Sequence, residues 1–363
     1  MARVLHDGRE DGLQPLKSLD LGPTSGLADM LDQMAKTAFG GRELGEAYHV
    51  LRAMADDPDC TIVVTVSGAM TVAKMDLVLC RMIEAGLAHL IVSTGAVMAH
   101  GLSQALGCVH YKYDPQVPDK QLYDWGYNRV YDTLEMEANL WDAQQLVGRA
   151  LEAVDWSQPC GSWHINRQVG RRLVEEGRMP SVLGIAFQRG VPVYVPALTD
   201  SELGLDVAAH FLAGRPAAAQ GEAHGAPDPE ALFAAAPPPL NPFLDLFDYT
   251  RRIHRAKRLG IFTVGGGVPR NWAQQVGPFN DLLNMRLGLK LPVPRFQYAV
   301  RLCPEPAHWG GLSGCTYAEG VSWGKFLSPE EGGRFAEVHS DATIAWPLLL
   351  AAVLERRNKA EGS

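Results

Sequence analysis

Residues 61–69 read Thr-Ile-Val-Val-Thr-Val-Ser-Gly-Ala, and this stretch combines two features that decide the fold. The run Thr61–Val66 consists entirely of β-branched residues, which is typical of a strand buried on both faces. A hydroxyl residue and a glycine follow at once, at Ser67 and Gly68. Small residues in this place are what a ligand-binding crevice at the carboxyl edge of a parallel sheet requires.

The same kind of apolar run recurs five more times along the chain. The further runs are Ala88–Val92, Val191–Val195, Gly260–Val264, Phe296–Val300 and Phe335–Val338. Stretches with helical periodicity separate most of them, and in one such stretch Val72, Met75, Leu79 and Met82 share a face. Strands that alternate with helices predict an α/β fold with a mostly parallel sheet and helices on both faces.

Glycine, hydroxyl or acidic residues also follow four of these later runs. They are Ser93-Thr94-Gly95-Ala96, Pro196-Ala197-Leu198-Thr199-Asp200, Gly265-Gly266-Gly267 and Ser340-Asp341-Ala342. Backbone amides at such strand ends can hold phosphates, so the pattern favours a dinucleotide crevice. A tight turn is the alternative for the triple glycine. The chain has neither Gly-x-Gly-x-x-Gly nor a Walker sequence, which disfavours a nucleoside triphosphate.

Composition narrows the functional class. The chain has 363 residues, of which 47% are hydrophobic and 20% charged, as in an ordinary soluble enzyme. Its net charge of −8 argues against a nucleic acid partner and is compatible with a cationic ligand. Six scattered cysteines without a Cys-x-x-Cys pair indicate reduced thiols, with no disulfide framework and no metal site. No apolar stretch reaches membrane-spanning length, and we expect a cytoplasmic protein without a membrane partner.

Three segments are distinguished by their composition. Residues 1–24 predict a flexible amino-terminal segment, and residues 25–357 predict a single domain. Within that domain, residues 213–239 are rich in Ala, Pro and Gly and poor in large apolar side chains. We expect a mobile surface insertion there.

One lysine stands in an unusual context, in the stretch Glu319-Gly320-Val321-Ser322-Trp323-Gly324-Lys325. A close-packed apolar wall disfavours an ammonium and lowers the pKa of a lysine, which suits a nucleophile. The Trp323 indole offers a face for a cationic substrate. An ordinary lysine at the carboxyl end of a helix is the alternative, and spacing alone does not exclude it.

Acidic and imidazole groups add weaker signals. Asp200, Glu202 and Asp206 are explained either by a helix amino terminus, which favours acids, or by a ribose acceptor with anchors for an ammonium. Asp341 has an N-cap role as its alternative. We keep His100 as a ligand candidate because it follows the strand end at residues 93–96, whereas other histidines such as His164 are expected to be structural.

Five of these motifs, taken in order, resemble the deoxyhypusine synthase family. They are Ser93–Ala96, Pro196–Asp200 with Leu203-Gly204, Gly265–Pro269, Glu319–Lys325 and Asp341-Ala342, and the resemblance runs from about Leu27 to Leu354. It implies a Rossmann-like α/β fold and a homotetramer with active sites at subunit interfaces. It also implies that NAD is the cofactor and that spermidine is oxidised, its aminobutyl fragment being carried as an imine on a lysine.

The resemblance and the residue patterns above together supply the site candidates, and the resemblance implies the role of the lysine. Lys325 is the imine-forming lysine, and Glu319 and Asn271 join it as catalytic candidates. The NAD candidates are Ser67, Gly68, Thr71, Thr94, Gly95, Ala96, His100, Asp200, Gly265, Gly266, Gly267, Asp341 and Ala342. The polyamine candidates are Glu202, Asp206, Gln275, Ser313, Glu319 and Trp323.

Departures from the family pattern concentrate on the acceptor side. Asn271 stands where the protein-modifying enzymes carry an active-site His, and Gln275 replaces a pocket asparagine. Ala99-His100 replaces a Glu pair, and Leu312 replaces an Asp. An amide cannot act as a general base at neutral pH, whereas an imidazole can.

The preferred functional prediction is NAD-dependent transfer of an aminobutyl group from spermidine to a free diamine such as putrescine, which gives homospermidine. The first alternative is deoxyhypusine synthase itself, acting on a lysine of a translation initiation factor. A second alternative is an inactive NAD-binding partner of a catalytic paralogue, against which Lys325 and Glu319 argue. A plain dehydrogenase is disfavoured by the missing Gly-x-Gly-x-x-Gly.

Overall fold

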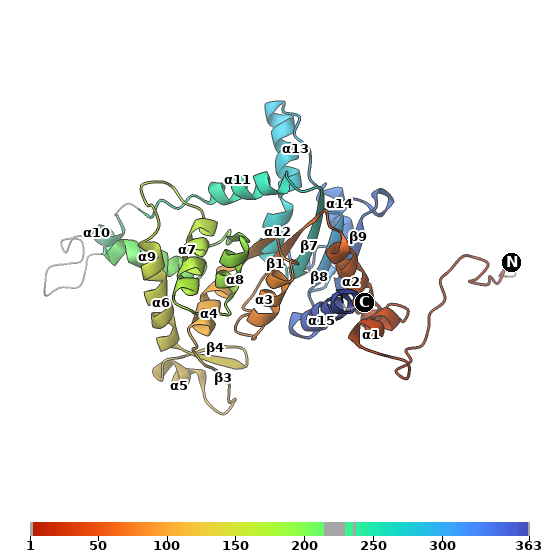
Figure 1. Ribbon diagram of the computed structural model, residues 1–363, viewed down its shortest axis with the longest axis horizontal. Coiled ribbons are helices and arrows are strands. Elements are labelled where there is room, and N and C mark those ends of the chain that lie inside the picture. The colour runs from red at the N-terminus through yellow and green to blue at the C-terminus, as the bar shows by residue number, and fades with distance from the viewer. Residues whose placement is uncertain (1–2, 214–228, 235–236, 362–363) are drawn as a thin grey trace.

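The computed structural model describes residues 3–213, 229–234 and 237–361 (Figure 1). The strands are β1 Cys60–Val66, β2 Leu90–Ser93, β3 His110–Lys112, β4 Tyr127–Val130, β5 Thr133–Met136, β6 Val193–Tyr194, β7 Arg258–Val264, β8 Tyr298–Leu302 and β9 Arg334–Val338. The helices are α1 Leu27–Met34, α2 Phe39–Asp56, α3 Asp76–Glu84, α4 Gly95–Ala105, α5 Asp119–Asp124, α6 Glu137–Leu151, α7 Ser162–Glu175, α8 Val182–Arg189, α9 Glu202–Ala213, α10 Pro229–Phe233, α11 Pro242–Ile253, α12 Gly267–Gln274, α13 Val276–Leu287, α14 Tyr317–Ser322 and α15 Ala342–Glu361. Two short 3₁₀ turns, Ala307–Trp309 and Pro329–Glu331, complete the regular structure of the described residues.

The main sheet contains six strands in the order β6-β2-β1-β7-β8-β9. Every neighbouring pair is parallel, and β1 pairs with β7 along its whole length, from Cys60↔Arg258 to Val66↔Val264. These six strands are the six runs predicted from the sequence, with ends displaced by a few residues. The predicted α/β class and parallel sheet are therefore confirmed.

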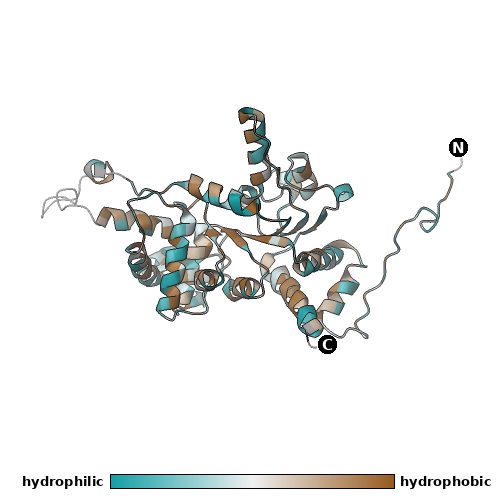
Figure 2. Cartoon of the chain, turned by 45° about the horizontal axis from the view of Figure 1, so that its top comes forward, coloured by the Kyte–Doolittle hydropathy of each residue, from teal (hydrophilic) through white to brown (hydrophobic). Residues whose placement is uncertain are grey.

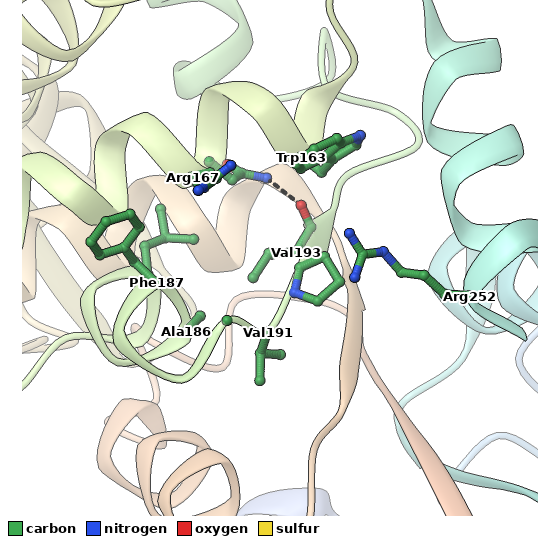
Figure 3. A pocket seen from close by; sticks show the side chains of 11 residues that line it. Trp163, Arg167, Ala186, Phe187, Val191, Val193 and Arg252 are labelled. Atoms are coloured by element: carbon green, nitrogen blue, oxygen red, sulfur yellow. Dashed lines mark hydrogen bonds between the residues drawn. The ribbon is translucent and has the colours of Figure 1, made fainter. Parts of the chain in front are cut away.

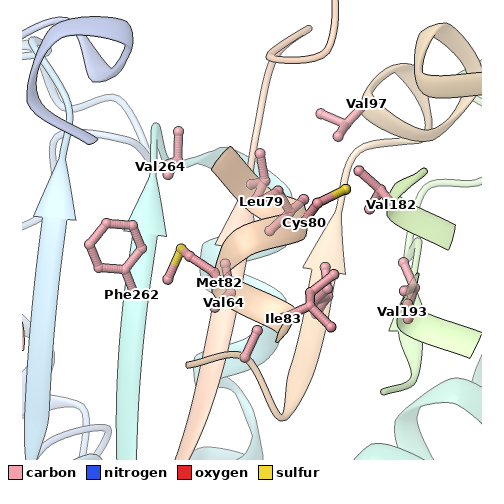
Figure 4. Packing of buried hydrophobic residues seen from close by; sticks show 14 of the residues in the cluster. Val64, Leu79, Cys80, Met82, Ile83, Val97, Val182, Val193, Phe262 and Val264 are labelled. Carbon is pink, nitrogen blue, oxygen red and sulfur yellow. The ribbon is translucent and has the colours of Figure 1, made fainter. Parts of the chain in front are cut away.

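Alternation along the central strands buries both faces of this sheet. Val64 of β1 and Phe262 of β7 belong to the larger core cluster, with Leu79 and Met82 of α3 packed beside them (Figure 4). The intervening Val63 belongs to a second cluster on the other face. Each fully buried aliphatic side chain contributes about 1.5–3 kcal/mol, so helices are required on both faces. The strands accordingly appear hydrophobic in Figure 2.

A second, three-stranded sheet was not predicted. It is antiparallel, in the order β3-β5-β4, and lies beside α4 and α5 (Figure 1). Its strands are only three or four residues long, and most side chains of β3 and β4 are at least partly exposed. Strands of this length and polarity have no apolar run or clear alternation by which to recognise them.

The boundaries of α3 correct one sequence prediction. The apolar face assigned to residues 72–82 begins only at Asp76, because the preceding residues form turns and Lys74 has a positive φ of 61°. Val72 is buried all the same. It is therefore a core residue of the loop between β1 and α3 and not part of the helix.

The segments outside the main body are described only in part. Residues 3–26 contain no helix or strand and extend away from the body (Figure 1). In the predicted insertion at 213–239, residues 214–228 and 235–236 lie outside the described residues, while α10 falls within it. No helix in the described part of the chain has the length and apolar character needed to span a bilayer.

Candidate active site

A small crevice lies at the carboxyl edge of the main sheet, where the strands β1, β2, β6 and β7 end. Its lining consists of Ser67, Ser93, Thr94, Gly95, Ala197, Asp200, Gly267, Val268 and Pro269. Five of these nine residues were NAD candidates from the sequence. The cavity holds about 120 Å³. Ligand pockets usually hold about 300–1,000 Å³, so one chain could enclose only part of a dinucleotide here.

Hydrogen bonds between the strand ends fix the walls of this crevice. The Ser67 hydroxyl donates to the Gly266 carbonyl. The Thr94 hydroxyl donates to the Gly68 carbonyl over 2.9 Å. The buried Thr71 hydroxyl donates to the Val97 carbonyl over 2.9 Å, so it supports α4 from the β1–α3 loop. These hydroxyls therefore join the loops after β1, β2 and β7 to one another.

Two glycines allow neighbouring segments to approach closely. A Cβ at residue 95 would lie 2.1 Å from the Ser201 Oγ, and a Cβ at residue 266 would lie 2.5 Å from the Ser313 Cα. Real Cβ contacts are never this short, so both positions require glycine unless the neighbour moves. Gly266 thereby brings the triple-glycine turn against the segment that precedes α14.

Two helices begin at this crevice. Thr94 and Gly266 are the N-cap residues of α4 and α12, and neither helix start has a side-chain cap. The first amides of a helix have no partner within the helix, and together with the helix dipole they favour an anion. The crevice thus offers donors of the kind that a pyrophosphate accepts, with the Asp200 carboxylate beside them.

Lys325 lies just beyond the carboxyl end of α14. Gly324 ends that helix with a φ of 67°, and the Lys325 amide donates to the Gly320 carbonyl over 3.1 Å. The Lys325 side chain is buried, with 8% exposure, and its Nζ donates to the Asn271 Oδ1 over 3.0 Å. The Trp323 ring centroid lies 6.0 Å from the same Nζ. The amine is therefore buried near an indole and has one neutral hydrogen-bond acceptor.

Burial lowers the pKa of Lys325, and the nearby Arg270 guanidinium lowers it further, although Cys315 and Glu319 act in the opposite direction. Arg270 is itself buried on α12 and stands 5.2 Å from the Tyr317 ring centroid. Its Nε and Nη2 have no hydrogen-bond partner within the described residues. A buried cation so close to the lysine is an arrangement that favours the neutral amine.

A buried ion pair positions the segment that leads to α14. Arg301 of β8 bonds to the Glu337 carboxylate of β9, and its Nη1 donates to the carbonyls of Ser313 and Cys315. Glu337 also accepts the Tyr317 amide over 2.7 Å. Charge-assisted bonds of this kind hold their partners firmly when they are buried. The main sheet therefore fixes the start of the helix that precedes Lys325.

The crevice and the lysine are joined through α12. Gly267, at the start of this helix, lines the crevice, and Asn271, four residues later, holds Lys325. Residues four apart on a helix share a face and stand about 6 Å apart along its axis. The cofactor candidates and the lysine are thus parts of one region of the chain.

Glu202 and Asp206 lie in another cavity, between α4, α6 and α9. Ala99, Trp141 and Gln144 are among its other lining residues. Burial and the neighbouring Glu202 carboxylate raise the pKa of Asp206 to about 6. Two carboxylates one helical turn apart beside an indole suit an ammonium group.

His100 forms a close pair with a residue that sequence reasoning missed. Its Nδ1 lies 2.5 Å from the Glu135 Oε2, on β5 of the unpredicted sheet. Burial opposes the charged imidazole, but the hydrogen bond and the attraction of Glu135 outweigh it and raise the pKa of His100. Burial likewise opposes the Glu135 carboxylate, yet the hydrogen bond to His100 and the nearby His110 ring, whose Nε2 lies 3.4 Å from Oε1, lower its pKa to about 2.

Several candidates are not brought to the crevice within one chain. Gln275 is exposed between α12 and α13, Glu319 is exposed on α14, and Trp323 is exposed just after that helix. Asp341 and Ala342 start α15 after the edge strand β9, two strands away from β7. Strands are spaced about 4.8 Å apart, which places these two residues roughly 10 Å from the triple glycine across the sheet.

A further cavity opens beside the amino end of β6 (Figure 3). Trp163, Arg167, Phe187 and Arg252 surround it, and the Asn166 amide donates to the Val193 carbonyl over 2.9 Å at its floor. It contains none of the predicted site residues. The described residues also hold no cluster of three His, Cys, Asp or Glu side chains suited to a metal ion.

Comparison with known proteins identifies the family. The family model for deoxyhypusine synthase matches residues 29–223 and 231–353. The chain belongs to the deoxyhypusine synthase family. It is 30% identical to "Probable deoxyhypusine synthase 2" of Methanosarcina mazei over 91% of this chain and 87% of that protein. It is 27% identical to the "Deoxyhypusine synthase-like protein" of Chlorobaculum tepidum over 95% of this chain and 91% of that protein.

The fold of the family is also recognisable in three dimensions. The solved structure of a candidate deoxyhypusine synthase from Entamoeba histolytica matches with a TM-score of 0.55 and 14% identity, over 94% of this chain and 97% of that chain. This likeness supports the fold, and the family model and the relatives confirm the family resemblance drawn from the sequence motifs. Of the residues that sequence reasoning missed, Arg270 had a signal in its position after the triple glycine, whereas Glu135 had none.

Proposed function

We propose that this chain catalyses NAD-dependent transfer of an aminobutyl group from spermidine, through an imine on Lys325, to a diamine such as putrescine. The observation that carries the proposal is the buried Lys325 amine, held by Asn271 on the helix that starts at the glycine crevice. A neutral amine is required for condensation with a carbonyl-level carbon, and burial beside Arg270 favours that form.

The crevice residues fit NAD. Gly95 and Gly267 line the crevice and place backbone there without a Cβ, where a pyrophosphate would lie. The uncapped amides at the starts of α4 and α12 would donate to its oxygens, and the Asp200 carboxylate would accept ribose hydroxyls. When bound, NAD would accept a hydride from the polyamine and later return it.

Cationic substrates would be held by carboxylates and an indole. We assign Glu202, Asp206 and the exposed Glu319 to ammonium groups and Trp323 to the methylene chain between them. The Lys325 amine donates a hydrogen bond to Asn271, which would fix the direction of the lone pair on the lysine nitrogen. Cytoplasmic location and the homotetramer, in which a second copy would supply Asp341 and Ala342 to the crevice, remain predictions.

Deoxyhypusine synthase activity on a protein lysine is the second candidate, favoured by the names of the curated relatives. Asn271 in place of the His of the protein-modifying enzymes supports the small-amine acceptor instead. Incubation with NAD, spermidine and putrescine, followed by separation of the polyamines, distinguishes the two. If the acceptor is a diamine, homospermidine should form. If the acceptor is a protein lysine, the aminobutyl group should appear only on an added initiation factor. The absence of both products would contradict both candidate functions.

The matched lysine variants test the site itself. Lys325→Ala should abolish product, because no other amine in the described site is buried beside the crevice. Lys290→Ala removes an exposed lysine after α13 and should leave the rate unchanged. Equal activity in both variants would contradict the proposal.

A further inference from the structure

The cavity beside the amino end of β6 is separate from the proposed active site (Figure 3). It shares no lining residue with the crevice, which lies at the opposite end of that strand. The cavity holds about 280 Å³, close to the lower end of the roughly 300–1,000 Å³ that is usual for ligand pockets. Its lining includes two arginines, Arg167 and Arg252, but no aspartate or glutamate. The space therefore suits a small molecule, and its charged side chains are all cationic.

Apolar side chains form the floor of this cavity. Ala186 on α8 and Val193 on β6 line it, and both belong to the larger core cluster. The Asn166 amide fastens α7 to β6 through the Val193 carbonyl, over 2.9 Å. The Phe187 ring stands at one side of the space and the Trp163 indole at another (Figure 3). A floor that is part of the core is in place before a ligand arrives, which lowers the cost of binding.

Arg252 of α11 is held with its guanidinium directed towards the cavity (Figure 3). Its Nε donates to the Asp248 Oδ2 over 2.8 Å, and the Tyr194 hydroxyl donates to the same oxygen over 2.7 Å. The guanidinium carbon lies 5.9 Å from the Trp163 ring centroid. Because Nε makes the bond to Asp248, the two Nη atoms keep N–H groups for a further acceptor. Arg252 therefore presents a planar pair of donors beside an aromatic ring.

Arg167 supplies a positive charge that the cavity does not compensate. It stands one helical turn after Trp163 on α7, so the two side chains share a face of the helix. Arg167 is exposed and makes no hydrogen bond or ion pair within the described residues. Asp248 offsets the charge of Arg252, so one positive charge at the cavity is left without a partner there. In a chain whose net charge is −8, this local excess favours a ligand with a single negative charge.

We propose that this cavity binds a small aryl carboxylate. The carboxylate accepts hydrogen bonds from the two Nη atoms of Arg252, because the guanidinium fork matches the geometry of a carboxylate. Arg167 adds electrostatic attraction from the solvent side. The ring of the ligand packs on the apolar floor between Trp163 and Phe187, where aromatic contacts add to the burial of apolar area. An inorganic anion would leave this floor uncovered, and a neutral aromatic molecule would leave the arginines without an acceptor.

Calorimetric titration of the full-length protein tests the chemistry of the ligand. Naphthoate carries a flat ring and a carboxylate, naphthamide has the same ring without the charge, and inorganic phosphate has charge without a ring. Naphthoate should bind at least about tenfold more tightly than either, because it alone uses both parts of the site. Saturating NAD should leave its affinity unchanged. Equal binding of naphthamide or phosphate, or displacement of naphthoate by NAD, would overturn the proposal.

Two variants locate the bound naphthoate. Arg252→Lys keeps a charge beside Asp248 but loses the guanidinium fork, so the affinity should fall by about tenfold. Val191→Trp places a large ring at a half-buried position that lines the cavity, and it should abolish binding. Undiminished binding in both variants would place the ligand elsewhere and contradict the proposal.

Two arginines of α7 provide a matched pair of further variants. Arg167→Met removes the unpaired charge but keeps a long side chain, so naphthoate should bind about fivefold more weakly. Arg171 lies one helical turn further on, pairs with Glu175 over 2.7 Å and does not line the cavity. Arg171→Met should therefore leave the affinity unchanged. Both positions are exposed, so thermal unfolding should be the same in the two variants. Equal affinity for naphthoate in these two variants would show that Arg167 does not serve the site.

Discussion

The two edges of the main sheet differ in how they use charge. At the amino edge, Arg258 binds Asp57, Lys257 binds Asp59 at 3.0 Å, and the Tyr298 hydroxyl donates to Asp57 at 3.1 Å. At the carboxyl edge, the same strands end in glycines, hydroxyls and helix starts without side-chain caps. One edge satisfies its polar groups internally, and the other leaves donors for a ligand. Under the proposed function, the first edge serves stability and the second serves binding.

The largest expected effect comes from filling the carboxyl edge. Gly266→Ala would place a Cβ 2.5 Å from the Ser313 Cα, so the backbone must move. We expect NAD affinity to fall by at least about 100-fold and the free energy of unfolding to fall by about 1–3 kcal/mol. Calorimetric titration with NAD and thermal unfolding measure the two effects. Unchanged affinity would remove the crevice from the cofactor site.

A shift in a pH profile tests the environment of the lysine. Arg270→Met removes a positive charge that lowers the pKa of Lys325, so that pKa should rise. At pH 8 the rate of trapped-imine formation should drop about tenfold, which corresponds to one pKa unit. Arg255→Met, at an exposed position, is the control. A profile that stays in place, or moves to lower pH, would show that Arg270 does not tune the amine.

Breaking the amino edge should affect stability alone. The Arg258 hydrogen bond lowers the pKa of Asp57 from 3.8 to about 2, despite partial burial. The carboxylate therefore contributes stability above its unfolded pKa and loses that contribution as the pH falls towards 2. Asp57→Asn should lower the free energy of unfolding at pH 7 by about 1 kcal/mol and flatten its decline between pH 4 and 2. Weaker NAD binding in this variant would contradict the division between the edges.

The smallest effect is expected at a glycine outside both edges. Gly148 lies inside α6, and nothing stands within 4 Å of a Cβ added there. Gly148→Ala should raise the free energy of unfolding by about 0.5–1 kcal/mol, because alanine loses less backbone entropy in a helix. Denaturant titration measures it. A loss of stability would mean that a neighbour needs the space at residue 148. Crowding beside a glycine would then not distinguish Gly266 from Gly148.

Much of the fold could be predicted because its signal is local. The run Thr61–Val66 is β-branched throughout and ends in Ser-Gly, so both the strand and the crevice residue Ser67 follow from nine consecutive residues. The antiparallel sheet offered no such signal. Its strands pair short polar stretches, and the sequence could not reveal that Glu135 would be buried against His100.

Candidate site residues could be named from the sequence, but the contacts between them could not. Asn271 and Lys325 were both named from the sequence, yet they are 54 positions apart, and only the packing of α12 against the end of α14 joins them. The burial of Arg270 beside Tyr317 depends on the same packing. Sequence periodicity predicts helices and strands, but it does not predict contacts between residues so far apart in the chain.

Peptide mapping after borohydride trapping tests the central claim most directly. Protein incubated with NAD and spermidine should carry the aminobutyl adduct on Lys325, and the adduct should be absent without NAD or in Lys325→Ala. Its yield should rise with pH to half its maximum below pH 10.5, the ordinary pKa of lysine. An adduct spread over exposed lysines, or none on Lys325 when NAD binds, would contradict the account.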